Sequence, residues 1–296
     1  MTLYAVSFSL FQSEGVRMVQ TVNYSELVER DFAAVRSAIR SGLYTGHTAG
    51  LAKGHLQCNL AIVSGDLADD FHEFCRLNPK SCPLAGVSEP GNPQVERLGE
   101  TVDIRTDAAR YNIYRRGVLA EQVPDLIDVW QRDFVAFAIG CSFTFENALL
   151  RAGISMRHIE MDVTVPMYRS SIKTVPCGPF GGDTVVSMRP IREDRIDEVF
   201  EICRSYPLAH GAPLQIGAPE EIGVADVGKP DWGNAVDIGE GEVPLFWACG
   251  VTPQVAIMQA KSALSITHAP GAMLIAEVSE QCAPIYPYND NKKSTF

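Results

Sequence analysis

The sequence predicts an α/β protein, built either as one large domain or as two interlocked lobes. The chain has 296 residues, which is too long for one small core. Amphipathic helical segments alternate with short apolar runs of strand length, and one strand–loop–helix pattern occurs twice. Hydrophobic residues make up 46% of the chain and charged residues 21%. This composition is typical of a globular protein and not of a disordered one.

The composition also excludes several classes of function. A net charge of −11 argues against nucleic-acid binding, because phosphate groups require a basic surface. An anionic small molecule stays compatible if Arg side chains or helix N-termini bind it locally. No run approaches the roughly 18 uncharged apolar residues of a membrane span. Residues 1–17 lack the basic region and cleavage site of a signal peptide, and we interpret them as an N-terminal extension.

The eight cysteines include no CxxC pair. A chain of this size needs no disulfides, so we expect reduced, buried thiols in a cytoplasmic protein.

The first half of the chain contains recognisable elements. Amphipathic spacing predicts helices at 24–42 and 66–77. We expect a strand at 58–63 and a strand-like segment at 103–107.

The strand–loop–helix pattern occurs at two places. Residues 134–140 predict a buried strand, followed by a loop and then a helix at 145–152. Residues 243–260 repeat this order, with Pro253 in the first helical turn. The segments 135–152 and 243–260 align without a gap. An internal duplication is one interpretation, and convergence on a similar composition is the other. A duplication would bring two helix N-termini to a shared cleft.

Common catalytic signatures are absent from the sequence. It contains no GxSxG elbow, no HExxH pair and no Gly-rich phosphate loop. His72 and Cys75 lie one helical turn apart with Cys82 beyond, but three ligands without a clear fourth favour a structural role. We therefore expect chemistry without a metal or another cofactor.

Several unusual loop sequences occur in an order that resembles a known family. The most distinctive are DIRTD (103–107), GCSFTFE (140–146), FWACGVTPQ (246–254) and ITHAPGAMLI (266–275). They resemble the D-glutamate cyclase family of hydro-lyases, over nearly the whole chain. Two positions depart from the family pattern, which more often has His at Gln215 and Asp at Glu277.

The resemblance implies a three-layer αβα lobe joined to a smaller two-layer α/β lobe. We assign residues 18–115 and 206–296 to the first lobe, and 116–205 to the second. The resemblance also implies a lyase that converts D-glutamate to 5-oxo-D-proline and water. The expected partner is therefore a small amino dicarboxylate, with no nucleic acid and no membrane, and a homodimer is a further hypothesis. A hydratase or dehydratase of another small carboxylic acid is one alternative. A non-catalytic amino-acid-binding protein is the other.

Cyclisation makes specific demands on the site. The α-amine must attack the side-chain carboxyl, so the substrate must be held curled, its ammonium deprotonated and the departing oxygen protonated. Cationic or N–H donors are needed for two carboxylates, one of which becomes a tetrahedral oxyanion.

The DIRTD segment offers charged candidates. Arg105 matches an α-carboxylate bidentately, and its alternative role is an ion pair within the loop to Asp103 and Asp107. Either Asp103 or Asp107 is a candidate for binding the substrate ammonium and accepting its proton, with a structural carboxylate as the alternative.

The two repeated loops offer hydrogen-bond donors ahead of helices. The hydroxyls of Ser142, Thr144 and Thr252 are candidates for binding a carboxylate or oxyanion, together with backbone N–H groups. Glu146 is the candidate acid if burial raises its pKa, and a capping-box partner otherwise. Gln254 occupies the position that corresponds to Glu146 in the second copy.

His210 and His268 both precede Ala-Pro turns, as HGAP and HAPG. Each is a candidate acid or base, or else forms a turn-stabilising hydrogen bond. Tyr168 and Arg169 are weaker candidates for substrate contact.

Cys141 and Cys249 occupy corresponding positions in the two loops. A nucleophilic thiol is possible in principle, but a thiolate does not readily attack an unactivated carboxylate. Because no ATP site is visible to activate one, packing at a tight turn is the favoured role.

Overall fold

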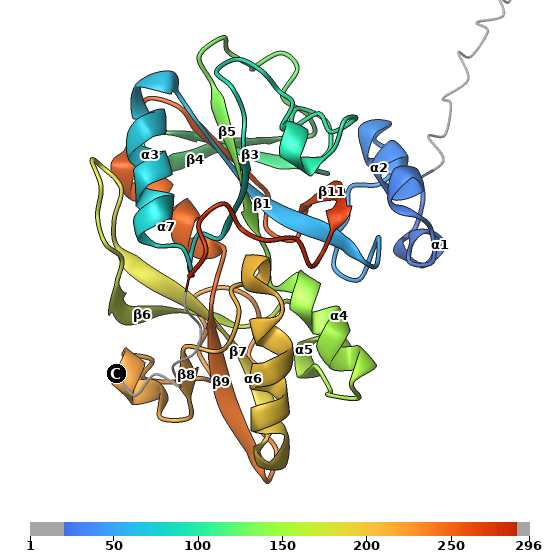
Figure 1. Cartoon of the computed structure of the whole chain (residues 1–296), viewed down its shortest axis with the longest axis vertical. Helices are drawn as coiled ribbons and strands as arrows, with labels where there is room; N and C mark the ends of the chain where they lie inside the picture. The colour runs from blue at the N-terminus through green and yellow to red at the C-terminus, as the bar shows by residue number, and fades with distance from the viewer. Residues whose placement is uncertain (1–20, 289–296) are drawn as a thin grey trace, which may run out of the picture.

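Two antiparallel β-sheets organise the chain in the computed structural model, which describes residues 21–288 (Figure 1). The large sheet has the strand order β2–β5–β1–β10–β3–β4, and β11 also pairs with β1. Its strands are β1 (His55–Val63), β2 (Leu84–Val87), β3 (Tyr111–Arg115), β4 (Val118–Val123), β5 (Val135–Gly140), β10 (Ser265–His268) and β11 (Leu274–Ser279). The small sheet has the order β6–β7–β9–β8. Its strands are β6 (Met167–Lys173), β7 (Asp183–Arg192), β8 (Gln215–Ile216) and β9 (Glu242–Ala248).

Short helices connect and cover these strands. The α-helices are α1 (Tyr24–Leu27), α2 (Phe32–Arg40), α3 (Gly65–Leu77), α4 (Phe143–Arg151), α5 (Arg157–Glu160), α6 (Ile196–Arg204) and α7 (Val251–Ala260). The 3₁₀-helices are η1 (Glu96–Leu98), η2 (Glu193–Arg195), η3 (Pro207–Ala209) and η4 (Pro219–Ile222). No helix within residues 21–288 is long and apolar enough to cross a membrane.

The large sheet is buried on both faces because alternate residues of its apolar strands point in opposite directions. On one face, Ala61 and Val63 of β1 pack with residues of α3 and α7. On the other face, Leu60 and Ile62 pack with η1 and the loops around it. One face therefore has a helical cover and the other has mainly loops.

The small sheet repeats this arrangement. Helices α4 and α6 pack on Leu245 and Trp247 of β9. The opposite face is covered by the segment that contains Ile222 and Val236. The predicted α/β class is confirmed, with two sheets that each carry helices on one face.

Several predicted elements are confirmed. The strand at 58–63 is part of β1, the helix at 66–77 is α3, and both strand–loop–helix units are present as β5–α4 and β9–α7. Their strands belong to different sheets. The proposed duplication stays a prediction.

Two predicted elements are wrong. The helix at 24–42 is interrupted, because the Asp31 carboxylate accepts a hydrogen bond from the Ala34 N–H and begins a new helix. Residues 103–107 form turns and not a strand, because the Asp103 carboxylate binds the N–H of Arg105 and the Asp107 carboxylate binds the N–H of Asp103. The predicted N-terminal extension at 1–17 lies outside the described residues.

The sheets divide the chain differently from the predicted lobes. Strands β4 and β5 lie within 116–205 but belong to the large sheet. Strands β8 and β9 lie outside that range but belong to the small sheet. The lobe boundaries at 116 and 205 stay predictions.

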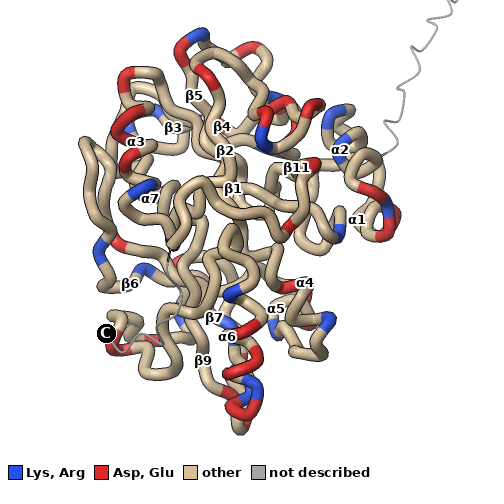
Figure 2. Tube along the Cα trace, in the orientation of Figure 1, with Lys and Arg blue, Asp and Glu red and all other residues tan. Residues whose placement is uncertain are grey.

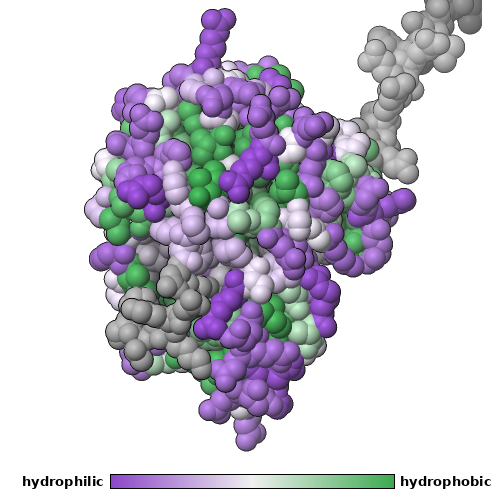
Figure 3. Space-filling model, viewed as in Figure 1, coloured by the Kyte–Doolittle hydropathy of each residue, from purple (hydrophilic) through white to green (hydrophobic). Residues whose placement is uncertain are grey.

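Charged residues are spread over the outer parts of the molecule in Figure 2, with acidic and basic residues interleaved. The face shown in Figure 3 is mostly polar, with apolar residues in small groups. Charged side chains that are buried therefore need a specific explanation.

One buried charge, Asp107, attaches α2 to the large sheet. Its side chain is 0% exposed and lies 2.7 Å from Arg40 Nη2 and 3.7 Å from Arg36 Nε. Arg36 also binds Glu277 of β11 at 2.7 Å. Because a buried carboxylate is costly without cations, these two arginines determine where α2 packs.

We expect Asp107→Asn to lower the free energy of unfolding by about 3 kcal/mol, because it leaves Arg36 buried with one anionic partner fewer. Urea unfolding measures this change. Asp128→Asn, at an exposed loop position, is the control and is expected to change little. Equal stability of the two variants would contradict a structural role for Asp107.

Candidate active site

Helices α4 and α7 begin where the two sheets meet. Strand β5 belongs to the large sheet, but α4 after it packs on the small sheet through Phe145 and Leu149. Strand β9 belongs to the small sheet, but Ala256 and Ile257 of α7 pack in the core of the large sheet. Each chain segment thus crosses between sheets at its strand–helix turn. The N-termini of both helices consequently lie at the junction.

Asn59, in the middle of β1, lies between the two turns. Its Nδ2 donates to the Gly140 carbonyl at 2.8 Å. A Cβ added to Gly250 would lie 2.2 Å from the same Nδ2. A Cβ added to Gly140 would lie 1.7 Å from the Leu208 carbonyl. Glycine at both positions therefore allows the turns to approach β1 and the segment that carries His210.

The charged centre of the junction is Arg189 of β7, whose side chain is 0% exposed. Its Nε lies 2.9 Å from Glu146 Oε1, and its Nη groups donate to Ser187 Oγ at 2.9 Å and Ser142 Oγ at 3.1 Å. The guanidinium also lies against two rings, 4.9 Å from the Phe145 centroid and 5.2 Å from that of Trp247. All three nitrogens of Arg189 are engaged.

Glu146 is held as an anion by two partners. Besides Arg189, His158 Nε2 lies 3.2 Å from Glu146 Oε1. Burial raises the pKa of Glu146, but the charges and hydrogen bonds of Arg189 and His158 outweigh burial and lower it to about 2. The expectation that burial makes Glu146 an acid is therefore wrong. Its side chain is not a capping-box partner either, because it binds Arg189.

Three polar atoms at this junction lack a hydrogen-bond partner within the described residues. They are His210 Nε2, Thr144 Oγ1 and Trp247 Nε1, and all three residues are buried. The His210 Nδ1 lies 2.9 Å from the Lys80 carbonyl, which requires the proton on Nδ1 and leaves a free lone pair on Nε2. Burial, together with the Arg189 charge, lowers the pKa of His210 to about 4, so its imidazole is neutral at pH 7. His210 has φ of 70°, a left-handed conformation that sets its ring direction.

The two cysteines of the repeated turns are protonated. Burial raises the pKa of Cys141 to about 12 and that of Cys249 to about 11. Hydrogen bonds from the N–H groups of Phe143 and Val251 act in the opposite direction and are outweighed. These thiols suit packing better than nucleophilic attack.

We call this set of side chains the polar junction. Its members are Asn59, Cys141, Ser142, Thr144, Glu146, His158, Ser187, Arg189, His210 and Cys249.

Two further predicted residues lie on α7. Thr252 Oγ1 accepts a hydrogen bond from the Val185 N–H at 2.9 Å and so ties α7 to β7. Gln254 is buried on the same helix.

The DIRTD residues lie apart from the junction, beside α2 and β11. Arg105 binds Asp103 through two hydrogen bonds of 3.0 and 2.7 Å, and Asp107 binds Arg36 and Arg40. Arg105 therefore forms an ion pair with Asp103, one of the two carboxylates proposed as its partners from the sequence. This geometry favours the structural interpretation of Arg105.

Three other predicted residues have structural contacts. His268 occupies the position where β1 changes partner from β10 to β11, and its Nδ1 accepts from the Leu60 N–H at 3.0 Å. Tyr168 donates to the Val227 carbonyl at 2.7 Å, and the Arg169 guanidinium lies 4.8 Å from the Trp232 ring centroid. Tyr168 and Arg169 both lie on β6, an edge strand of the small sheet.

Sequence reasoning missed Asn59, His158 and Arg189. Arg189 had a detectable signal, because it is the one charge in the apolar run TVVSMRPI and a lone charge in a buried strand requires a partner. The other two had none, since each acquires its role only through partners distant in sequence.

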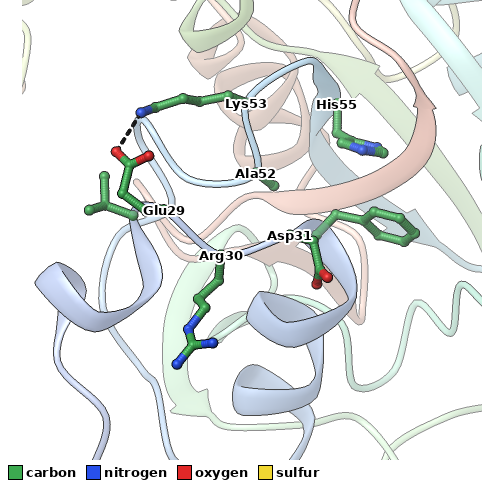
Figure 4. Close-up of a pocket in the computed structure, with 8 residues that line it drawn as sticks. Glu29, Arg30, Asp31, Ala52, Lys53 and His55 are labelled. Atoms are coloured by element: carbon green, nitrogen blue, oxygen red, sulfur yellow. Dashed lines mark hydrogen bonds and ion pairs between the residues drawn. The ribbon is translucent and has the colours of Figure 1, made fainter.

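A surface depression of about 350 Å³ lies elsewhere, beside α1 and α2 (Figure 4). Its lining residues are Val28, Glu29, Arg30, Asp31, Phe32, Ala52, Lys53 and His55. Lys53 points to Glu29, which it binds at 2.7 Å, and Asp31 caps α2. None of the predicted site residues lines this depression, so we place the candidate site at the polar junction.

Residues 21–288 contain no group of three or more His, Cys, Asp or Glu placed to hold a metal ion.

Comparison with known proteins identifies close relatives. A family profile described as D-glutamate cyclase matches residues 135–277. A protein of Dinoroseobacter shibae is 58% identical over 257 residues, which cover 87% of this chain and 86% of the relative. Proteins of Ruegeria pomeroyi and Pseudomonas aeruginosa are 55% and 49% identical, covering 88% and 86% of this chain and 94% and 96% of the relatives. All three are named "Putative hydro-lyase". The solved structure of a nitrogen repressor-like protein of Methanococcus jannaschii aligns with 83% of this chain and 97% of its own chain, at 10% identity. The TM-score of 0.35 is too low to inform the fold.

The Glu146 carboxylate generates a testable pH dependence. Its pKa in the folded state is about 2, below the ordinary value of 4.5, so its stabilisation is present above about pH 4.5 and is lost as the pH falls toward 2. Glu146→Gln lacks this stabilisation and leaves Arg189 buried without its anion, which costs about 3–5 kcal/mol at neutral pH.

Urea unfolding of both proteins, from about pH 7 down to about pH 3, checks this expectation. The difference in stability should be largest at neutral pH and shrink below about pH 4.5. A difference that does not depend on pH would show that Glu146 is not held as an anion.

Proposed function

Because this chain belongs to the D-glutamate cyclase family, we propose that it is a lyase that converts D-glutamate to 5-oxo-D-proline and water at the polar junction. One observation carries this proposal. Two buried polar atoms without partners, on His210 and Thr144, lie at the junction where two helices begin, beside an Arg–Glu pair whose charges are already satisfied. Unpartnered buried polar atoms are costly in a folded protein unless a ligand uses them.

His210 supplies the base. Its Nε2 lone pair is free, and its Nδ1–H is committed to the Lys80 carbonyl, so the ring has the tautomer that accepts a proton at Nε2.

The helix N-termini and Thr144 bind the carboxylates. Helices α4 and α7 both direct their positive ends to the junction, which favours an anion there. The Thr144 hydroxyl adds a donor for the oxyanion that forms at the attacked carboxyl. Arg189 acts by position, holding Glu146 and Ser142 at the start of α4.

The reaction balances without an additional reactant. The α-nitrogen forms a bond to the side-chain carboxyl carbon, and one C–O bond of that carboxyl breaks. Two protons leave the ammonium group, pass through His210 Nε2 and reach the departing oxygen as water. The product keeps the α-carboxylate and gains a lactam.

Substrate access requires movement at the junction. Cys141, Ser142 and Cys249 are 7%, 7% and 8% exposed and are the most exposed members of the polar junction. In this proposal, the substrate enters when the two turns separate. Its hydrogen bonds to His210 and Thr144 then close the site.

The test is incubation of the full chain with D-glutamate, with 5-oxo-proline detected by NMR and its configuration by chiral chromatography. We expect turnover that survives EDTA, since the steps above use side chains alone. His210→Asn should lower kcat about a hundredfold or more, because it removes the base, and circular dichroism checks that the variant stays folded. His47→Asn, at an exposed histidine, is the control.

Two outcomes would contradict the proposal. The first is that D-glutamate is not converted while another small carboxylic acid is turned over. The other is full activity of a folded His210→Asn variant, which would remove His210 from the chemistry.

Arg105→Lys separates the two roles that the sequence allowed for Arg105. We expect kcat/KM to stay within about threefold of the unmodified protein, because Arg105 is engaged with Asp103 away from the junction. A substrate clamp would instead lose about ten- to hundredfold, since Lys cannot reproduce a bidentate contact. Steady-state kinetics with D-glutamate distinguishes the two.

A further inference from the structure

Strand β4 is an exposed edge of the large sheet. Residues 118–122 are all exposed, with Val118 at 69% and Leu119 at 51%. Neighbouring residues of a strand point to opposite faces, so apolar side chains are exposed on both faces of β4. Ile127 beyond its end, at 57% exposed, is a third apolar side chain in this region.

Other sheet edges have partners. The Leu84 carbonyl of β2 accepts from the Ile285 N–H at 2.8 Å. Met167 of β6 exchanges hydrogen bonds with Trp232, at 2.9 and 3.2 Å. Within residues 21–288, β4 pairs with β3 alone, and Ala120 is an extra residue of β4 where the register between the two strands shifts. An exposed edge with unpaired N–H and C=O groups is a template for another strand.

The charges flanking β4 indicate which strand fits. Arg115 and Arg116 precede the strand, whereas Asp125 and Asp128 follow it. Arg115 already lies 3.6 Å from Glu121 of its own chain, which leaves Arg116 at the exposed tip. One end of β4 is therefore basic and the other acidic.

We propose that a second copy of this chain pairs with β4 in antiparallel orientation, about a twofold axis. Antiparallel pairing brings the basic end of each copy, with Arg116, beside the acidic end of the other, with Asp125. Opposite charges across strands stabilise such a ladder. A twofold axis uses the same surface on both copies, so no separate complementary surface is needed. The large sheet then continues from one copy into the other.

Sedimentation velocity of the full chain over a wide concentration range tests this dimer. We expect a monomer–dimer equilibrium that Leu119→Lys weakens about tenfold or more, because it places a cation in the apolar contact on both copies. Ala120→Pro should act similarly, because it adds a ring to the exposed edge strand and removes an N–H. Val175→Lys, at an apolar loop residue 50% exposed, is the matched control and should leave the equilibrium unchanged.

Charge reversal tests the orientation. Arg116→Glu and Asp125→Lys should each weaken the dimer, and the double variant should restore it, because the pair then reverses together. A monomer at all concentrations would overturn the proposal. So would a dimer insensitive to Leu119→Lys and Ala120→Pro, which would place the contact elsewhere. Circular dichroism of each variant confirms that a loss of dimer is not a loss of fold.

Discussion

The burial of Arg189 is the constraint on which the arrangement of this protein depends. A guanidinium that is 0% exposed is costly unless every nitrogen is engaged, and here Glu146, Ser142 and Ser187 engage them while two aromatic rings cover its faces. These partners come from the start of α4, from β7 itself and from β9. Satisfying one charge therefore joins the strand–helix turn of one sheet to the middle of the other.

The same constraint determines the chemistry of the polar junction. Without Arg189 and His158, burial alone would raise the pKa of Glu146, whereas with them it is lowered to about 2. Burial, with the Arg189 charge adding to it, lowers the pKa of His210 and keeps that imidazole neutral. A neutral base with a free lone pair is suited to accept a proton from an ammonium substrate.

A second buried ion cluster has a different purpose. Asp107, Arg36, Arg40 and Glu277 join α2 to the 103–107 turn and to β11, and Thr101 is a further partner of both arginines. Like the polar junction, this cluster retains an unpartnered buried atom, Arg36 Nη1. The two clusters differ in position, since this one joins a helix to one sheet, whereas the polar junction lies where both sheets meet. That difference is why the DIRTD motif belongs to the framework in our interpretation, and Arg189 belongs to the site.

The sequence by itself determined the elements whose cause is local. Apolar runs and amphipathic spacing predicted β1, α3 and both strand–loop–helix units, and the loop GCSFTFE identified Ser142, Thr144 and Glu146 as neighbours of a helix start. Only the tertiary structure decided which charges meet, because Arg189 and Glu146 are 43 residues apart in sequence and Arg36 and Glu277 are 241 apart. The sign of the Glu146 pKa shift and the free lone pair of His210 both follow from such distant contacts. Local patterns carry no information about them, since the energy of a buried polar group depends on its partners and not on its neighbours in the chain.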